Sequence, residues 1–234
     1  MKPALVVADF AGTMFLEEGA VVAAYRSAFK AFGIEASDED IAARRGASKR
    51  SVFEELAGRT RPVDEARIIA GQALVVFEAA LREEYSSGPV QEVPGAGEAA
   101  RCLRGAGVRV ALASGFERGL VDLLLGRLGW DELFDLTIAG NDVAAGRPAP
   151  LIIYHAMERL AVHDVAMVAV VGDTPLDLQA GMNARAGWVI GVLSGAHGVE
   201  TLGATPHSHL LSSVAGLPAL FGLAESTTSR PPAG

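Results

Sequence analysis

The chain has little cysteine, little lysine and no long uncharged apolar run, and each shortage excludes a class of protein. Its single cysteine, Cys102, permits no intramolecular disulfide and no cysteine metal cluster. The longest uncharged apolar stretch, residues 68–77, is too short to span a bilayer. The N-terminus also lacks the basic-then-apolar pattern of a signal peptide. We therefore expect a soluble cytoplasmic protein.

An excess of positive charge is missing as well. The formal net charge of the 234 residues is -8, and half of the residues are hydrophobic. Nucleic acids and anionic membranes both favour basic surfaces, so neither is expected as a partner. The length is enough for a core domain and a smaller second domain.

Residues 15–88 show helical periodicity and no convincing strand. Residues 51–54 form a capping-box pattern at the start of one helix, with Ser48 as an alternative N-cap. A long helix is expected over residues 64–85, and residues 86–89 are the expected hinge. Such an insert, placed directly after a first strand, predicts an all-helical cap domain over residues 15–88.

The rest of the chain alternates between strands and helices. This pattern predicts an α/β fold with a doubly wound, Rossmann-like parallel sheet, built from residues 1–14 and 89–224. The Ser/Thr/Pro-rich residues 225–234 are expected to be a disordered tail. The expected strands cover residues 5–9, 108–113, 136–139, 165–171, 188–192 and 209–214.

Polar groups follow the apolar strands at their carboxyl ends, where open α/β sheets bind ligands. Asp9 ends the first run, and Gly12 allows a tight turn after it. Ser114 and Gly115 end the second run, so a hydroxyl and backbone N–H groups can hold an anion there.

Two later segments add a cation and further carboxylates. Arg147 lies in a proline-rich loop just before an expected helix. Asp173 follows the fourth strand, and Asp177 comes four residues later. The set predicts phosphoryl transfer. Asp9 would attack phosphorus, Asp173 would share a Mg²⁺ ion with it, and Ser114 and Arg147 would hold the remaining phosphoryl oxygens.

The order of these motifs resembles the haloacid dehalogenase superfamily, whose first motif matches residues 9–13. The resemblance implies that Asp9 is both nucleophile and metal ligand. It further implies that the Ala11 carbonyl and Asp173 bind Mg²⁺, and that Asp177 lies behind these ligands or reaches the ion through a water molecule. Thr13, in the first motif, is predicted to bind phosphate together with Ser114, Gly115 and Arg147. The sequence leaves the oligomeric state open, with a homodimer among the choices.

Ala11 departs from the pattern of most phosphatases in this family, which carry an aspartate at this position as the general acid. Such help is worth ~10²–10⁴-fold. The sequence Asp-x-Ala-Gly-Thr resembles instead the phosphonoacetaldehyde hydrolase (phosphonatase) branch. That branch cleaves a carbon–phosphorus bond and uses a cap lysine, which forms an imine with the substrate aldehyde as an electron sink.

Lys49 is the candidate for this lysine. The chain has only two others, Lys2 and Lys30, and Lys30 falls on an exposed helix position. Arg44, Arg45 and Arg50 surround Lys49 in sequence, and their charge is expected to favour the neutral amine.

Three alternatives remain open. Lys49 could grip a phosphate instead of forming an imine, in a phosphatase or phosphomutase that acts on a small phosphate ester. The chain could also be a non-catalytic protein that binds a phosphate ligand. Finally, Arg45 and Val52 stand where the phosphonatase loop carries methionine and histidine, so the substrate could be a phosphonate related to phosphonoacetaldehyde.

Overall fold

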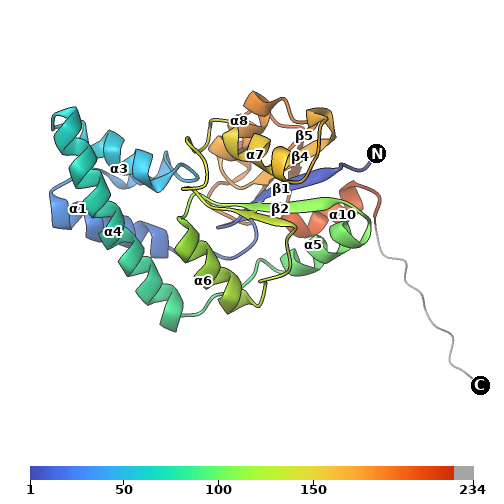
Figure 1. The fold of residues 1–234 in the computed structure, drawn as a ribbon, viewed down its shortest axis with the longest axis horizontal. Coiled ribbons are helices and arrows are strands. Elements are labelled where there is room, and N and C mark those ends of the chain that lie inside the picture. Colours follow the sequence, from blue (N-terminus) through green and yellow to red (C-terminus); the bar gives the residue numbers. More distant parts are fainter. Residues whose placement is uncertain (224–234) are drawn as a thin grey trace, which may run out of the picture.

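The computed structural model describes residues 1–223 and contains a six-stranded parallel sheet with helices on both faces (Figure 1). The sheet order is β3-β2-β1-β4-β5-β6, so β1 lies in the centre. This confirms the expected doubly wound α/β fold. The predicted tail, residues 225–234, lies outside the described residues. The strands are β1 (Leu5–Asp9), β2 (Arg109–Ala113), β3 (Leu136–Ile138), β4 (Val168–Gly172), β5 (Trp188–Val192) and β6 (His209–Leu211).

The central strand β1 is buried on both faces, which explains its continuous apolar sequence. Val6 and Ala8 belong to the core that includes residues of α5, whereas Leu5 and Val7 contact the core formed with α7 and α8. Helices α5 and α10 accordingly lie on one side of the sheet, and α7 and α8 on the other (Figure 1). The core helices are α5 (Ala96–Gly105), α6 (Arg118–Leu128), α7 (Leu151–Arg159), α8 (Pro175–Ala184), α9 (Val199–Gly203) and α10 (Leu217–Leu220).

Strands β2 and β3 are each one residue shorter than expected, and β4 and β6 differ more from the expectation. Residues Val165–Met167 form a 3₁₀ turn, because the Asp164 side chain accepts a hydrogen bond from the Ala166 N–H, and β4 begins only at Val168. Strand β6 pairs with β5 alone, and its last partner is Val192 at the end of β5. A second 3₁₀ turn covers Val214–Gly216.

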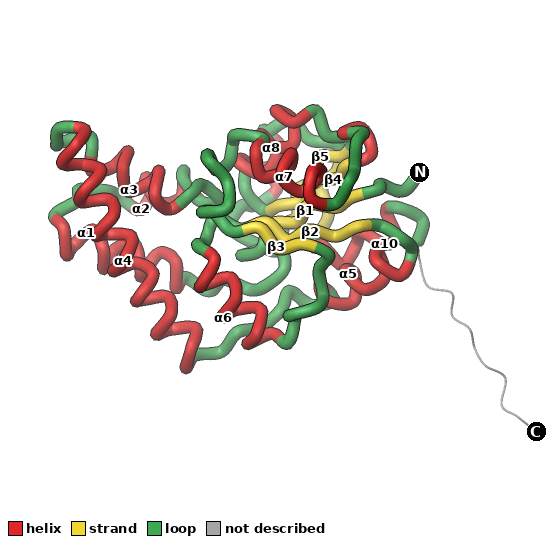
Figure 2. Tube along the Cα trace, viewed as in Figure 1, coloured by secondary structure: helices red, strands yellow, loops and turns green. Residues whose placement is uncertain are grey.

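Between the first two strands the chain forms a separate helical layer, visible beside the sheet in Figure 2. An aromatic cluster of Tyr25, Phe29, Phe53 and Phe77 holds this layer together, with ring centroids 4.6–5.7 Å apart. None of the helices within residues 1–223 could cross a membrane, given their length and polarity. The helices of this layer are α1 (Ala20–Phe32), α2 (Asp38–Ala42), α3 (Lys49–Ala57) and α4 (Val63–Ser87).

Helix α3 begins earlier than the capping-box pattern at residues 51–54 predicted. Its N-cap is Ser48, the alternative that the sequence offered, and Lys49 is its first residue. Ser51 lies inside the helix, where its hydroxyl donates to the Ser48 carbonyl at 2.8 Å, so it cannot cap the helix. The earlier start fixes the backbone of Lys49.

Phe15 marks the junction between the helical layer and the sheet. It is fully buried and bridges to Ala11 on one side and to Glu92 on the other. Its ring contacts the rings of Phe10 and Tyr85. The boundaries of the proposed cap, residues 15–88, remain a prediction.

Candidate active site

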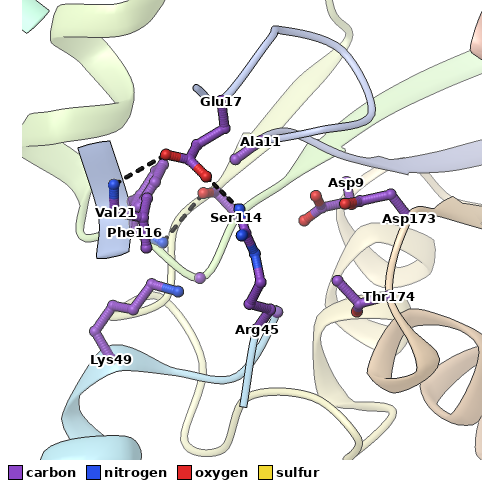
Figure 3. Close-up of a pocket in the computed structure, with 12 residues that line it drawn as sticks. Asp9, Ala11, Glu17, Val21, Arg45, Lys49, Ser114, Phe116, Asp173 and Thr174 are labelled. Atoms are coloured by element: carbon purple, nitrogen blue, oxygen red, sulfur yellow. Dashed lines mark hydrogen bonds and ion pairs between the residues drawn. The ribbon is translucent and has the colours of Figure 1, made fainter. Parts of the chain in front are cut away.

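Three neighbouring strands deliver polar side chains to one edge of the sheet. Asp9 ends β1, Ser114 follows β2, and Asp173 follows β4. Because β2 and β4 both pair with β1 in parallel, their carboxyl ends meet at this edge. All three side chains line the same pocket (Figure 3).

A cluster of carboxylates forms the floor of this edge. Asp9, Asp173 and Asp177 are buried, and one oxygen of each lies within 4.8 Å of the others. Burial raises the pKa of Asp9 to about 8, against the lowering effect of Arg147 and with a smaller rise from the charge of Asp177. Burial and, to a smaller extent, the charge of Asp177 raise the pKa of Asp173 to about 6. Hard divalent cations such as Mg²⁺ prefer oxygen ligands of this kind and relieve the repulsion. The donor set therefore fits the magnesium ion that the sequence predicts.

Two groups hold Asp173 in place. The Thr13 hydroxyl donates to Asp173 Oδ1 at 3.2 Å, and the Ala196 N–H donates to Oδ2 at 2.7 Å. Thr13 is fully buried and does not line the pocket. The structure thus places the Thr13 hydroxyl where it orients a carboxylate, and phosphate binding by Thr13 stays a prediction. Gly12 is required here, because its φ is 87° and a Cβ would lie 2.4 Å from Asp173 Oδ2.

Arg147 lies beneath the pocket, between two of the carboxylates. Its Nη1 donates to Asp9 Oδ1 at 2.5 Å and also to Asp177 Oδ1. The other oxygen of Asp177 accepts from the N–H and hydroxyl of Thr174 at 3.0 and 2.6 Å. Asp177 is therefore occupied by protein donors. Among the described residues the buried Nη2 of Arg147 has no hydrogen-bond partner, and Arg147 does not line the pocket that Ser114 lines, so phosphate binding by Arg147 stays a prediction.

Ser114 and Gly115 form the wall opposite the carboxylates. Ser114 is buried, and its Oγ accepts a hydrogen bond from the Phe116 N–H at 3.1 Å. This contact turns the hydroxyl toward the pocket that Gly115 and Ala11 also line.

Lys49 enters the same pocket from the helical layer. It is buried, with Nζ 5.8 Å from the ring centroid of Tyr25 and 5.5 Å from that of Phe116. Nζ makes no hydrogen bond or ion pair within residues 1–223, so it is free to meet a ligand.

The pKa of Lys49 is lowered to about 8, but the cause differs in part from the expectation. Burial has the largest effect, followed by the positive charge of Arg147; Arg45 contributes less. Arg44 pairs instead with Glu55 at 2.5 Å, and Arg50 lies 3.8 Å from Glu117. Because these two arginines face glutamates, they are not among the causes of the lowered pKa of Lys49.

The sequence did not predict the pair formed by Glu17 and Arg45, which also lines the pocket. Glu17 lies in the segment between β1 and α1, and Arg45 precedes α3 (Figure 3). Nothing in the spacing of two residues 28 positions apart signals such a contact. The aromatic walls, Tyr25 and Phe116, likewise become recognisable only once the helices are placed.

The helical layer contacts the core closely at positions where a glycine leaves room for the neighbouring residue. A Cβ on Gly46 would lie 2.5 Å from the Thr174 hydroxyl oxygen, and one on Gly115 would lie 2.9 Å from the Ala47 carbonyl oxygen. A Cβ on Gly146 would lie 2.8 Å from the Cβ of Ser48. These contacts keep Lys49 close to the strand ends.

We expect Gly146→Ala to lower kcat/KM by about 10- to 100-fold with little loss of thermal stability, because the added methyl group displaces the segment that carries Lys49. Gly203→Ala is the control, since nothing lies within 4 Å of the added atom. Ser48→Gly in the Gly146→Ala background should restore part of the rate. Equal activity of Gly146→Ala and wild type in steady-state kinetics would contradict the tight seating.

Comparisons with known proteins show the family of this chain and several relatives. Residues 3–185 match the haloacid dehalogenase-like hydrolase family. The phosphonoacetaldehyde hydrolase of Syntrophobacter fumaroxidans is 29% identical over 80% of this chain and 71% of its own length. The probable phosphatase IndB of Dickeya dadantii is 32% identical over 86% of both chains.

Other alignments are shorter, and the structural likeness concerns the fold. With two further curated relatives, 33% and 34% identical, the alignment covers only 40% and 36% of the relative's length. The crystal structure of a phosphonoacetaldehyde hydrolase-like protein from Oleispira antarctica superposes with a TM-score of 0.79 at 19% identity. That match covers 95% of this chain and 94% of the other.

Proposed function

Because this chain belongs to the haloacid dehalogenase-like hydrolases, we propose that it cleaves the carbon–phosphorus bond of a small phosphonate with a reactive carbonyl group, such as phosphonoacetaldehyde. The observation that carries the proposal is the buried Lys49 amine, which opens into the same pocket as Asp9. The similarity to a phosphonoacetaldehyde hydrolase supports it.

Asp9 supplies the nucleophile. Its carboxylate attacks phosphorus and forms an aspartyl-phosphate, which water then hydrolyses to orthophosphate. Ser114 and the Gly115 N–H would hold the oxygens of the phosphoryl group, and Arg147 would hold the Asp9 carboxylate in position. A Mg²⁺ ion bound to Asp9, Asp173 and the Ala11 carbonyl would neutralise the clustered carboxylates and the anionic substrate.

Lys49 supplies the electron sink that carbon–phosphorus cleavage needs, which the methyl side chain of Ala11 cannot provide. Cleavage of a carbon–phosphorus bond leaves an electron pair on carbon, and Ala11 has no acid to offer. The Lys49 amine first condenses with the carbonyl and releases water. The resulting imine takes up the electron pair as an enamine, which is protonated on carbon and hydrolysed to free the aldehyde and the amine.

Release of equal amounts of orthophosphate and acetaldehyde from phosphonoacetaldehyde, in the presence of Mg²⁺, tests the proposal. A simple phosphate monoester serves as the control and should be hydrolysed far more slowly, since no acid assists an alkoxide. Rapid hydrolysis of the ester without cleavage of the phosphonate would overturn the proposal.

The pH dependence of imine formation should report Lys49. Burial lowers its pKa to about 8, so the nucleophilic amine dominates above that pH and the ammonium below it. We expect the yield of the borohydride-reduced adduct to rise with pH, with a midpoint near 8. Asp9→Asn is the best background, because its side chain cannot titrate. Loss of the Asp9 charge should move the midpoint slightly lower, since Asp9 raises the Lys49 pKa.

A midpoint near the ordinary lysine value of 10.5 would show that Lys49 is solvated in solution. The yield should be followed from about two pH units below 8 to about one unit above 10.5, so that either midpoint is resolved.

A phosphatase acting on a small phosphate ester is the second candidate. The relative named as a probable phosphatase, which covers 86% of this chain at 32% identity, favours it. In that case Lys49 would bind the ester as a cation. Ala11→Asp restores an acid beside Asp9 and should raise monoesterase activity by ~10²-fold or more if the site is otherwise built for esters. No gain in ester hydrolysis would count against this candidate.

A further inference from the structure

Arg45 places a second positively charged side chain in the pocket, beside that of Lys49. Its guanidinium forms an ion pair with Glu17 across the junction between the helical layer and the core. In Figure 3 its side chain stands between Lys49 on one side and Asp9 with Asp173 on the other. The positive charge of Arg45 acts on both sides of the pocket, since it contributes to lowering the pKa of Lys49 and opposes the rise in the pKa of Asp173.

Glu17 holds this guanidinium in place, and both of its carboxylate oxygens accept hydrogen bonds from the protein. Its side chain is 2% exposed, and its Oε1 accepts from the N–H groups of Gly19 and Val21, each at 2.9 Å. Its Oε2 accepts from Arg45 Nη2. Three donors hold the Glu17 carboxylate in one orientation. The position of Arg45 is therefore fixed before a ligand arrives.

Arg45 itself has donors to spare. Within residues 1–223 its only side-chain partner is Glu17, so Nε and Nη1 donate to no protein acceptor. The side chain is 24% exposed, and Arg45 lines the pocket that holds Asp9 and Lys49. A guanidinium with unused N–H groups in a substrate pocket fits a carboxylate, which it can bind through two parallel hydrogen bonds.

We infer that Arg45 forms a carboxylate-binding subsite, and that the substrate is a phosphonate with a carboxylate next to its carbonyl carbon, such as 3-phosphonopyruvate. The choice of this substrate class rests on the proposed function, because Lys49 must take the carbonyl. Arg45 and Lys49 project into one pocket from the same short segment, so they contact neighbouring groups of the substrate.

The reaction balances with water alone. The Lys49 amine condenses with the keto carbon and releases one water molecule. Attack of Asp9 on phosphorus breaks the carbon–phosphorus bond, and its electron pair enters the iminium to give an enamine. Protonation of the methylene carbon and two hydrolyses then yield pyruvate, orthophosphate and free enzyme. The carboxylate is unchanged, so Arg45 only binds and selects.

Calorimetry with two unreactive ligands tests the subsite without any cleavage. 3-Phosphonopropanoate carries the carboxylate, whereas propylphosphonate does not, and neither has a carbonyl for Lys49. With Mg²⁺ present, wild type should bind 3-phosphonopropanoate about tenfold more tightly or better. This preference should vanish in Arg45→Met. Arg59→Met, which removes a cap arginine paired with Asp40 at 2.6 Å on the surface, should keep it.

Loss of Arg45 leaves Glu17 buried without its cation, so the double variant Arg45→Met/Glu17→Gln is measured beside the single one. Equal affinities of wild type for the two ligands would overturn the subsite. The subsite would also be overturned if Arg45→Met lowered the affinity for both ligands equally, because Arg45 would then only hold the cap in position.

Kinetics separates this inference from the proposed function. We expect a higher kcat/KM for 3-phosphonopyruvate than for phosphonoacetaldehyde, and a reversal in Arg45→Met. Preference of the wild type for phosphonoacetaldehyde would contradict the substrate class and leave the proposed function intact. No cleavage of either compound would end the proposed function and the substrate class, while the ligand preference would still decide the subsite.

Discussion

Asp9→Asn should abolish phosphate release, with a loss of at least ~10⁴-fold in kcat. The amide has the size of the carboxylate but cannot attack phosphorus. The fold should survive, because the change removes one of three crowded buried carboxylates while Arg147 keeps Asp177 as its partner. Steady-state kinetics and a thermal melt of the same preparation check both halves of the expectation.

Asp177→Asn is the matched control. Its carboxylate is occupied by Arg147 and Thr174, so the amide should disturb positioning and lower the rate by a smaller factor than Asp9→Asn does. A variant Asp9→Asn that keeps more than about a hundredth of the activity would contradict a role for Asp9 as nucleophile.

Lys49→Arg should lower carbon–phosphorus cleavage by at least ~10³-fold, which corresponds to about 4 kcal/mol in the barrier. Arginine keeps the positive charge near the rings of Tyr25 and Phe116, but it cannot form an imine with the substrate. Both kcat and the borohydride-trapped fraction should fall together.

The matched control is Lys30→Arg, an exposed position on α1 that should leave the kinetics unchanged. If Lys49→Arg retained full activity, a gripping cation would be sufficient and the imine would be unnecessary. The same result would favour the phosphatase candidate.

The pattern of strand ends was predictable because it follows from topology. Asp9, Ser114 and Asp173 each follow an apolar strand, and parallel pairing brings these ends to one edge. Lys49 could be singled out because the chain has few lysines, and the structure places its side chain in the same pocket as Asp9.

Other parts of the site depend on how the helical layer sits on the core, which no local pattern encodes. Glu17 and Arg45 meet across the junction, and Arg147 becomes the second cause of the low Lys49 pKa through space. Thr13 belongs to the motif at residues 9–13, yet its hydroxyl turns to Asp173 because the tight turn at Gly12 brings the two together.

A local sequence pattern also predicted the start of α3 at the wrong residue. Residues 51–54 match the capping-box pattern, but the chain already turns helical after Ser48. The two capping boxes that the structure shows for α2 and α8 use Ser37 with Asp40 and Thr174 with Asp177. The second of these serves the site, since it fixes the carboxylate that holds Arg147.

The most direct test of the central claim is borohydride trapping with phosphonoacetaldehyde, followed by mass spectrometry of the peptide that contains Lys49. We predict a reduced adduct on Lys49 that is absent in Lys49→Arg and present in Lys30→Arg. Release of phosphate from phosphonoacetaldehyde with no adduct on Lys49 would contradict the account.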